Sequence, residues 1–243
     1  MYDSPKFLAA GDQAIVIELG DEISAECNRQ VHNLRKAIER EAIEGVVDLI
    51  PTYRSLLIQY DGTQVSYADM ASRLASLQTI TTETEEEAPT VVHLPTLYEG
   101  DYGPDLGFVA ENAGISANDV IELHSGTDYL VYMMGFTPGF PYLGGMSDKI
   151  ATPRLATPRP TIPAGSVGIA EAQTGVYPID SPGGWQLIGR TPLRLFDVTR
   201  VEPSLLDAGD YVHFVPLSSE DEYRQIESQI ASGEYQVTTT AKV

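Results

Sequence analysis

The sequence predicts an α+β protein, with a small α/β domain at the N-terminus and a larger, mostly β domain after it. Three observations predict this fold class. Apolar residues in the first 80 positions alternate between strand and helix spacing, and an acidic run follows. The remainder holds many short apolar runs between Gly and Pro corners. A length of 243 residues leaves room for one large domain or two modest ones.

The N-terminal pattern is a split β-α-β arrangement. Ser24 is placed to cap a helix whose apolar residues recur on one face, and Ser66 is placed to open a second helix. If residues 90–94 add a last strand, the order becomes β-α-β-β-α-β, which is the ferredoxin-like arrangement. The expected elements are a strand at 14–19, a helix from 24 to 42, strands at 46–50 and 55–60, a helix from 66, and a strand at 90–94.

An acidic run marks the expected domain boundary. Residues 79–89 (TITTETEEEAP) contain four glutamates and no apolar period, which is typical of a solvated linker. We therefore expect a ferredoxin-like α/β domain over residues 1–82, an acidic linker over 83–89, and a second domain over 90–243.

The second domain is expected to be a closed β-barrel with a few short helices, because closure removes exposed strand edges. Residues 135–192 hold ten of the 21 glycines and nine of the 16 prolines. Aromatic and aliphatic residues that need burial are interleaved among them, so ordered loops are predicted rather than disorder. The expected elements are helices starting near Asp105 and Ser116, strands at 128–136, 193–198 and 211–217, and a terminal helix at 218–230.

Composition argues against several classes of partner. The net charge of −20 should repel nucleic acid and anionic membranes, so neither is expected. Cys27 is the only cysteine, which excludes an intramolecular disulfide. No apolar run approaches the ~20 residues that a membrane helix needs, and no signal peptide is recognised, so a cytoplasmic protein is expected.

The common catalytic motifs are absent. The sequence contains no phosphate-binding loop, no G-x-G-x-x-G after a strand and no H-E-x-x-H. The four histidines lie far apart without metal-ligand spacing, so no metal site is predicted. The remaining candidates are polar and aromatic residues in or beside the glycine-rich loops: His124, Arg154, Arg159, Ser166, Gln173, Thr174, Tyr177, Trp185 and Arg190.

Two interpretations of these candidates stay open. Arginine binds carboxylates through a bidentate fork, so the three arginines suggest an anionic small ligand. The same arginines could instead tether loop carbonyls or pair with a local acid such as Asp180. His124 could carry a proton near pH 7 or cap carbonyls at a helix end, and Trp185 could line a pocket or anchor the packing.

Five motifs occur in order along the glycine-rich stretch. They are 135–144 (GFTPGFPYLG), the pairs Pro153-Arg154 and Pro158-Arg159, 163–169 (PAGSVGI), 173–178 (QTGVYP) and 181–192 (SPGGWQLIGRTP). With these motifs the chain resembles the KipI/allophanate hydrolase subunit 1 family, which includes a subunit of prokaryotic 5-oxoprolinase. The resemblance implies a small α/β domain followed by a cyclophilin-like β-barrel.

The resemblance also implies a function. The expected protein is a subunit of a heteromeric, ATP-dependent 5-oxoprolinase that opens 5-oxoproline to glutamate and is inactive alone. Its implied partners are subunit 2 of the same family system and a third subunit, with ATP shared among them and an anionic substrate. Alternatives are an inhibitor of a sensor histidine kinase, or a component of a biotin-dependent carboxyltransferase or allophanate hydrolase system.

Under this interpretation the candidates take three roles. His124 and Arg190 are the catalytic candidates. The expected backbone N–H donors lie in two loops, at Gly135, Gly139, Gly165 and Ser166. The expected substrate contacts are Arg154, Arg159, Gln173, Thr174 and Tyr177.

Overall fold

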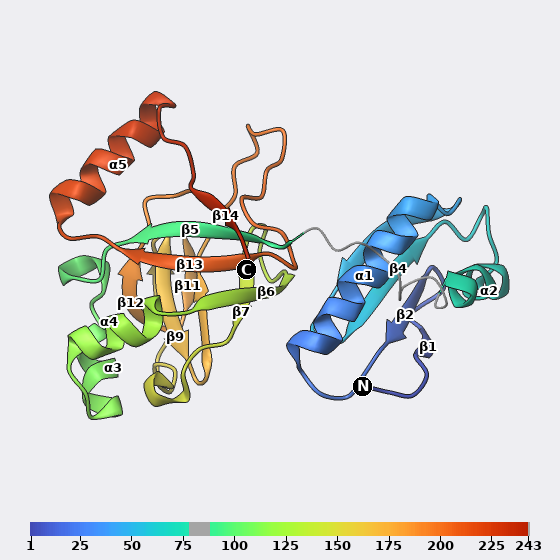
Figure 1. Ribbon diagram of the computed structural model, residues 1–243, viewed down its shortest axis with the longest axis horizontal. Helices are drawn as coiled ribbons and strands as arrows, with labels where there is room; N and C mark the ends of the chain where they lie inside the picture. The colour runs from blue at the N-terminus through green and yellow to red at the C-terminus, as the bar shows by residue number, and fades with distance from the viewer. Residues whose placement is uncertain (78–87, 243) are drawn as a thin grey trace. The chain divides into compact units, whose positions relative to one another are not determined.

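The computed structural model describes residues 1–77 and 88–242 (Figure 1). The chain divides into two compact units, residues 1–87 and 88–243. Most of the predicted acidic linker, residues 83–87, lies outside the described residues. Within the described ranges, no helix combines the length and apolar character needed to cross a membrane.

The described part of the first unit contains a four-stranded antiparallel sheet in the order β1-β2-β4-β3, with two helices. Because β4 pairs with both β2 and β3, those two strands run parallel to each other on either side of it, and α1 connects them. This is the expected split β-α-β arrangement. The elements are β1 (Lys6–Ala9), β2 (Ala14–Glu18), α1 (Ala25–Glu41), β3 (Val46–Pro51), β4 (Ser55–Tyr60) and α2 (Tyr67–Leu77).

Both helices begin where the sequence predicts. The Ser24 side chain accepts a hydrogen bond from the Cys27 backbone N–H at 3.1 Å, and Ser66 accepts one from Asp69 at 3.2 Å. The apolar face of α1 and the inward residues of α2 pack on the sheet as one core. The helix α1 ends close to the expected position, with Ala42 in a left-handed conformation as its C-cap.

The fully ferredoxin-like arrangement is wrong in its last strand. Residues 90–96 form β5 (Thr90–Thr96), which lies in the sheet of the second unit and pairs in parallel with β13 (Tyr211–Pro216). The edge position beside β2 is filled by β1, a strand that was not predicted from the sequence. The apolar pattern of β5 marks a buried strand correctly, but it carries no information about which sheet the strand joins.

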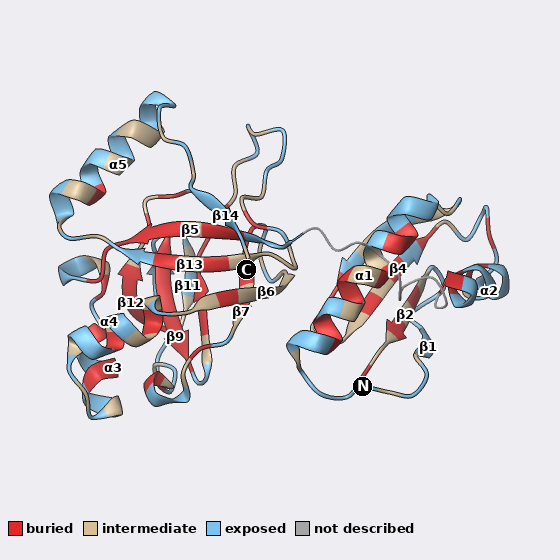
Figure 2. Ribbon diagram, viewed as in Figure 1, coloured by how far each residue is buried: buried red, intermediate tan, exposed pale blue. Residues whose placement is uncertain are grey.

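The second unit is built on an eight-stranded, mostly antiparallel sheet in the order β12-β9-β10-β7-β6-β13-β5-β14. Its central strands are largely buried, while α5 shows an exposed outer face (Figure 2). The remaining elements are η1 (Gly100–Tyr102), α3 (Leu106–Ala113), α4 (Ala117–Ser125), β6 (Asp128–Met134), β7 (Pro141–Gly144), η2 (Asp148–Ile150), β8 (Arg159–Ile162), β9 (Ser166–Ala170), β10 (Gln173–Val176), β11 (Ser181–Gly183), β12 (Gln186–Arg190), α5 (Glu220–Ser232) and β14 (Thr239–Ala241).

The predicted closed barrel is wrong for the residues that the structure describes. Strands β12 and β14 are the two edges of the sheet, and they are not paired with each other. One isolated bridge joins the residue after β5 to the last residue of β12. In this bridge, Leu97 and Arg190 exchange two backbone hydrogen bonds of 2.9 Å. The ladder stops there because the chain turns into η1, after which Gly103 lies against the Ile188 carbonyl with no space for a side chain.

The other predictions for the second unit have mixed outcomes. The predicted helices and the strands at 128–136 and 211–217 correspond to α3, α4, α5, β6 and β13. The strand predicted at 193–198 is wrong, because that segment forms a loop with a single bridge, between Phe196 and Ser204. Arg200 ties this loop to itself by donating to the carbonyl oxygens of Arg194 and Pro203.

Candidate functional site

A pocket of about 200 Å³ lies in the glycine-rich part of the second unit. Five aromatic rings, one arginine, one amide side chain, the end of β11 and the glycine after it line the pocket. Four of its residues were singled out from the sequence as site candidates, namely Arg154, Gln173, Tyr177 and Trp185. The complete lining is Phe136, Phe140, Tyr142, Arg154, Gln173, Tyr177, Pro182, Gly183, Gly184 and Trp185.

Edge-to-face aromatic contacts organise the pocket. The ring of Phe140 meets Trp185 at 5.9 Å between centroids and an interplanar angle of 88°, and it meets Tyr177 at 5.9 Å and 83°. Trp185 in turn lies over Gly175 of β10, where an added Cβ would approach the indole to 3.0 Å. Glycine at 175 therefore lets the indole lie close against the strand, and a larger residue would push the ring outward by a few tenths of an ångström.

Phe136 stands at the pocket with an unusual backbone. It has a φ of 62° although it is not glycine, and its side chain is 71% exposed. A tight turn holds it, since Gly135 N–H donates to Phe140 O at 3.1 Å and Phe140 N–H donates to Thr137 O at 3.0 Å. Left-handed backbone at a non-glycine residue costs energy and is concentrated at functional sites. An exposed aromatic ring held in this way is consistent with a binding role.

Phe136, Phe140 and Tyr142 were not predicted as site residues from the sequence. All three belong to the motif at 135–144, where their apolar character suggested burial in the core. The available signal was the density of aromatic residues beside glycines in that motif, since aromatic rings line most small-molecule pockets.

Arg154 is the positively charged group of the pocket. Its guanidinium lies over the Trp185 ring at 5.9 Å from the centroid, and it makes no ion pair with any described residue. Stacking of this kind holds the guanidinium while leaving its N–H donors at the edge of the plane. Burial raises the pKa of the Tyr177 hydroxyl, which therefore stays protonated near neutral pH. The pocket thus offers an unneutralised cation beside uncharged polar groups.

Arg159 lies behind the pocket wall and does not line the pocket. Its Nη2 is 2.7 Å from Asp105 Oδ1, and its Nη1 donates to the carbonyl oxygen of Trp185 at 3.3 Å. The other carboxylate oxygen of Asp105 accepts from the Leu187 backbone N–H at 2.6 Å. Arg159 therefore anchors the start of β12 to α3, and its charge is already neutralised.

His124 and Thr174 belong to a fully buried network. Thr174 donates to the Gly168 carbonyl at 3.1 Å, so its hydroxyl oxygen accepts from His124 Nε2, which is 2.7 Å away. His124 Nδ1 then accepts from the Tyr98 hydroxyl at 2.8 Å. Burial lowers the pKa of His124 to about 3, so the ring is neutral at pH 7 and lies away from solvent.

The predicted backbone donors are largely engaged within the fold. The N–H groups of Gly135, Gly165 and Ser166 donate to the carbonyl oxygens of Phe140, Tyr177 and Pro163, respectively. Gly139 has a φ of 79° and packs against Phe196, where a side chain would clash. These glycines shape the loops around the pocket, and three of the four N–H groups already have a partner.

Arg190 lies at the opposite end of β12 from the pocket. It lies five positions after Trp185 along a strand, a span of roughly 16 Å at about 3.3 Å per residue. It lines a different cavity together with Tyr102 and Arg224. Across the described ranges, no group of three or more His, Cys, Asp or Glu side chains is placed to hold a metal ion.

Comparisons with known proteins identify the family to which the chain belongs. Residues 5–206 match the family model for the carboxyltransferase domain, subdomain C and D, and the chain belongs to this family. Among its relatives is a 5-oxoprolinase subunit of Bacillus subtilis (strain 168), which is 45% identical over 222 residues, covering 87% of this chain and 92% of the relative. The family resemblance noted in the sequence is therefore confirmed.

Two solved structures extend the comparison. A conserved uncharacterized protein from Pyrococcus horikoshii is 50% identical, with a TM-score of 0.53, and the match covers 89% of this chain and 99% of that one. The urea amidolyase of K. lactis is 23% identical, with a TM-score of 0.77, over 98% of this chain but 16% of that one. The second likeness concerns the fold alone, and it places the same fold inside a much longer protein.

Proposed function

We propose that this chain is a subunit of a heteromeric, ATP-dependent 5-oxoprolinase and is inactive without its partners. The reaction converts 5-oxoproline, ATP and water into glutamate, ADP and phosphate. The similarity to a relative named as a 5-oxoprolinase subunit, over 92% of that relative, supports the proposal. The observation that carries it is the small aromatic pocket with Arg154 stacked on Trp185 and free of any ion pair among the described residues.

The chemistry of the pocket suits a small lactam that bears a carboxylate. The flat ring of 5-oxoproline would lie against the rings of Trp185 and Phe140, and its carboxylate would pair with the Arg154 guanidinium. Gln173 and Tyr177 would supply hydrogen bonds for the lactam N–H and C=O. A pocket of about 200 Å³ leaves little room beyond a ligand of this size.

In the proposed reaction, ATP transfers its γ-phosphoryl group to the lactam oxygen and leaves as ADP. The ring carbon becomes electrophilic, water adds to it, the C–N bond opens and phosphate leaves. This chain would hold and orient the substrate. The sequence has no phosphate-binding loop, so we assign most of the ATP contacts to the partner subunits.

The partners in this proposal are subunit 2 of the same family system and a third subunit. Phe136 and Arg154 are both exposed at the pocket, so a second protein surface could contact the ligand there. Closure by a partner would exclude water from the phosphorylated intermediate until the hydrolytic step. This accounts for the expected inactivity of the isolated chain.

The test is 5-oxoproline-dependent ATP hydrolysis, measured with this chain alone, with subunit 2, and with all three subunits. We expect turnover with the full set only. In the full set, Arg154→Gln should lower kcat/KM by about tenfold to 100-fold, mainly through KM, because the carboxylate contact is lost. The matched control is Arg29→Gln, which removes an exposed arginine from α1 and should leave kcat/KM unchanged. An assembled complex without 5-oxoproline-dependent turnover would refute the proposal.

A second candidate is a component of a biotin-dependent carboxyltransferase or allophanate hydrolase system. The name of the matching family model favours it. Carboxyl transfer by the assembled complex, without 5-oxoproline-dependent ATP hydrolysis, would select this candidate. Inhibition of a sensor histidine kinase stays a prediction that neither the pocket nor these relatives test.

A further inference from the structure

A second cavity, of about 540 Å³, lies where the end of β12 meets η1 and the first turns of α5. It is open and lined almost entirely by charged groups and one aromatic ring. None of its lining residues also lines the aromatic pocket. The lining consists of residues 99–102, Arg190, Glu220 and Arg224.

Arg190 provides an unneutralised positive charge in this cavity. Its guanidinium lies over the Tyr102 ring at 5.4 Å from the centroid, and it forms no ion pair with the described residues. Its Nε is buried and has no hydrogen-bond partner in the described chain. The Arg190 guanidinium is therefore available to an anionic group of a ligand.

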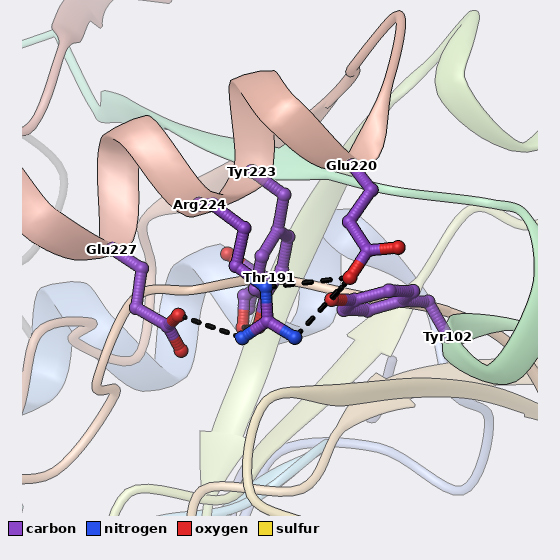
Figure 3. A network of polar contacts seen from close by, with 6 residues as sticks. All are labelled: Tyr102, Thr191, Glu220, Tyr223, Arg224 and Glu227. Atoms are coloured by element: carbon purple, nitrogen blue, oxygen red, sulfur yellow. Dashed lines mark hydrogen bonds and ion pairs between the residues drawn. The ribbon is translucent and has the colours of Figure 1, made fainter.

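The wall formed by Tyr102, Glu220 and Arg224 is fixed by its own contacts, as Figure 3 shows. The Tyr102 hydroxyl donates to Glu220 at 3.0 Å, and Arg224 bridges Glu220 at 3.2 Å and Glu227 at 3.0 Å. Tyr223 packs its ring 4.6 Å from that of Tyr102. The charge of Arg224 is therefore already engaged, and the Tyr102 ring that supports Arg190 is held in place.

Negative charge lies at the rim of the same cavity. Glu99 and Asp101 flank Gly100 in η1; both are exposed, and neither forms an ion pair with a described residue. A simple anion would be attracted by Arg190 but repelled by these two carboxylates and by the net charge of −20. A simple cation would be attracted by the carboxylates and by the net charge, but it would be repelled by Arg190 and would leave that guanidinium unpaired. A ligand that carries both charges avoids both conflicts.

We propose that this cavity binds a zwitterionic α-amino acid. The ligand carboxylate pairs with the Arg190 guanidinium, and the ammonium group faces Glu99 and Asp101. The site differs in ligand class from the aromatic pocket, because 5-oxoproline has an amide nitrogen where an amino acid has an ammonium group. Amino-acid binding at this cavity is therefore separate from substrate binding in the aromatic pocket, although one α-amino acid, L-glutamate, is also the product of the proposed reaction.

Isothermal titration calorimetry on the full chain tests the proposal without any enzymatic readout. The probes are L-glutamate, glutarate, which lacks only the ammonium group, and inorganic phosphate. We expect L-glutamate to bind at least tenfold more tightly than glutarate or phosphate. Arg190→Gln and Asp101→Asn should each weaken L-glutamate binding about tenfold, since each removes one of the two charge contacts.

The control variant is Arg29→Gln, which removes an exposed arginine that lines neither cavity and should leave L-glutamate binding unchanged. Because L-glutamate is also the product of the proposed reaction, Arg154→Gln is measured beside Arg190→Gln to tell the two cavities apart. Asp101 is exposed on η1, so Asp101→Asn remains a usable variant even if Arg190→Gln perturbs folding. Equal affinity for glutarate or phosphate, or tighter L-glutamate binding by Asp101→Asn, would overturn the proposal. So would the absence of L-glutamate binding, or its loss in Arg154→Gln with retention in Arg190→Gln.

Discussion

Gln173 and Thr174 are neighbours on β10, yet they belong to two different parts of the molecule. Gln173 lines the aromatic pocket, whereas Thr174 is buried and bonded to His124 in the core. Successive side chains of a strand point to opposite faces, so one residue of register separates the two environments. The two faces of β10 show that neighbouring polar residues in one motif can serve binding and stability separately.

The three arginines of the glycine-rich region divide in a similar way. Arg159 is neutralised by Asp105 behind the pocket wall. Arg154 and Arg190 each lie over an aromatic ring without an ion pair to any described residue, in two different cavities. Residue type suggested anion binding for all three. The distinction comes from the presence or absence of a carboxylate partner, and that partner is 54 positions away for Arg159.

Loss of the buried histidine on the core side of β10 should destabilise the protein most. His124→Ala removes a fully buried ring and leaves the hydroxyl of Tyr98 without its acceptor. We expect the free energy of unfolding to fall by about 3–5 kcal/mol, from the cavity and the unsatisfied polar group together. Gln173→Ala, on the pocket face of β10, should lower it by no more than about 1.5 kcal/mol, because the side chain is half-buried and its removal leaves no large cavity. Urea denaturation of both variants measures the difference, and similar losses would show that the two faces are not distinct.

The second expected effect is an acid sensitivity specific to the core network. The pKa of His124 is lowered by burial from its ordinary value of 6.5 to about 3. Between these values the unfolded chain binds a proton and the folded chain does not. The contribution of neutral His124 to the free energy of unfolding is therefore greatest above about pH 6.5. It falls on acidification, by up to ~1.4 kcal/mol per pH unit.

The variant His124→Gln isolates this contribution, because it keeps a polar side chain that does not titrate. We expect the loss of stability between pH 6.5 and pH 5 to be about 2 kcal/mol smaller in the variant than in the parent chain. Urea denaturation at the two pH values gives the comparison. An identical pH dependence in both chains would mean that His124 is protonated in the folded state.

Local chemistry made much of the fold predictable. Ser24, Ser66 and Ser116 cap the helices that the sequence predicts, since a cap depends on residues within one turn. The partner of β5 was not predictable, because strand pairing joins residues more than a hundred positions apart. The open edges of the sheet at β12 and β14 were not predictable either, since short strands and tight corners fit both open and closed sheets.

The candidate site was predictable as a region and less so residue by residue. The motifs contain Arg154, Gln173, Tyr177 and Trp185, and the structure brings all four to one pocket. The sequence alone could not distinguish the inward from the outward residues of β10. It also gave no indication that Phe136 would adopt a left-handed backbone, which side chains other than glycine rarely adopt.

Arg159 and Arg154 should differ slightly in their contributions to stability. Arg159→Gln should lower the free energy of unfolding by about 1 kcal/mol, because Asp105 keeps only its backbone donor; the partial exposure of the ion pair limits the loss. Arg154→Gln should leave stability unchanged within about 0.5 kcal/mol, since it removes only an exposed guanidinium over Trp185. Urea denaturation of the two variants and the parent chain under the same conditions measures both changes in the free energy of unfolding. A larger loss for Arg154→Gln than for Arg159→Gln would mean that the stacked guanidinium supports the fold, and the pocket would then lose its free cation as a binding group.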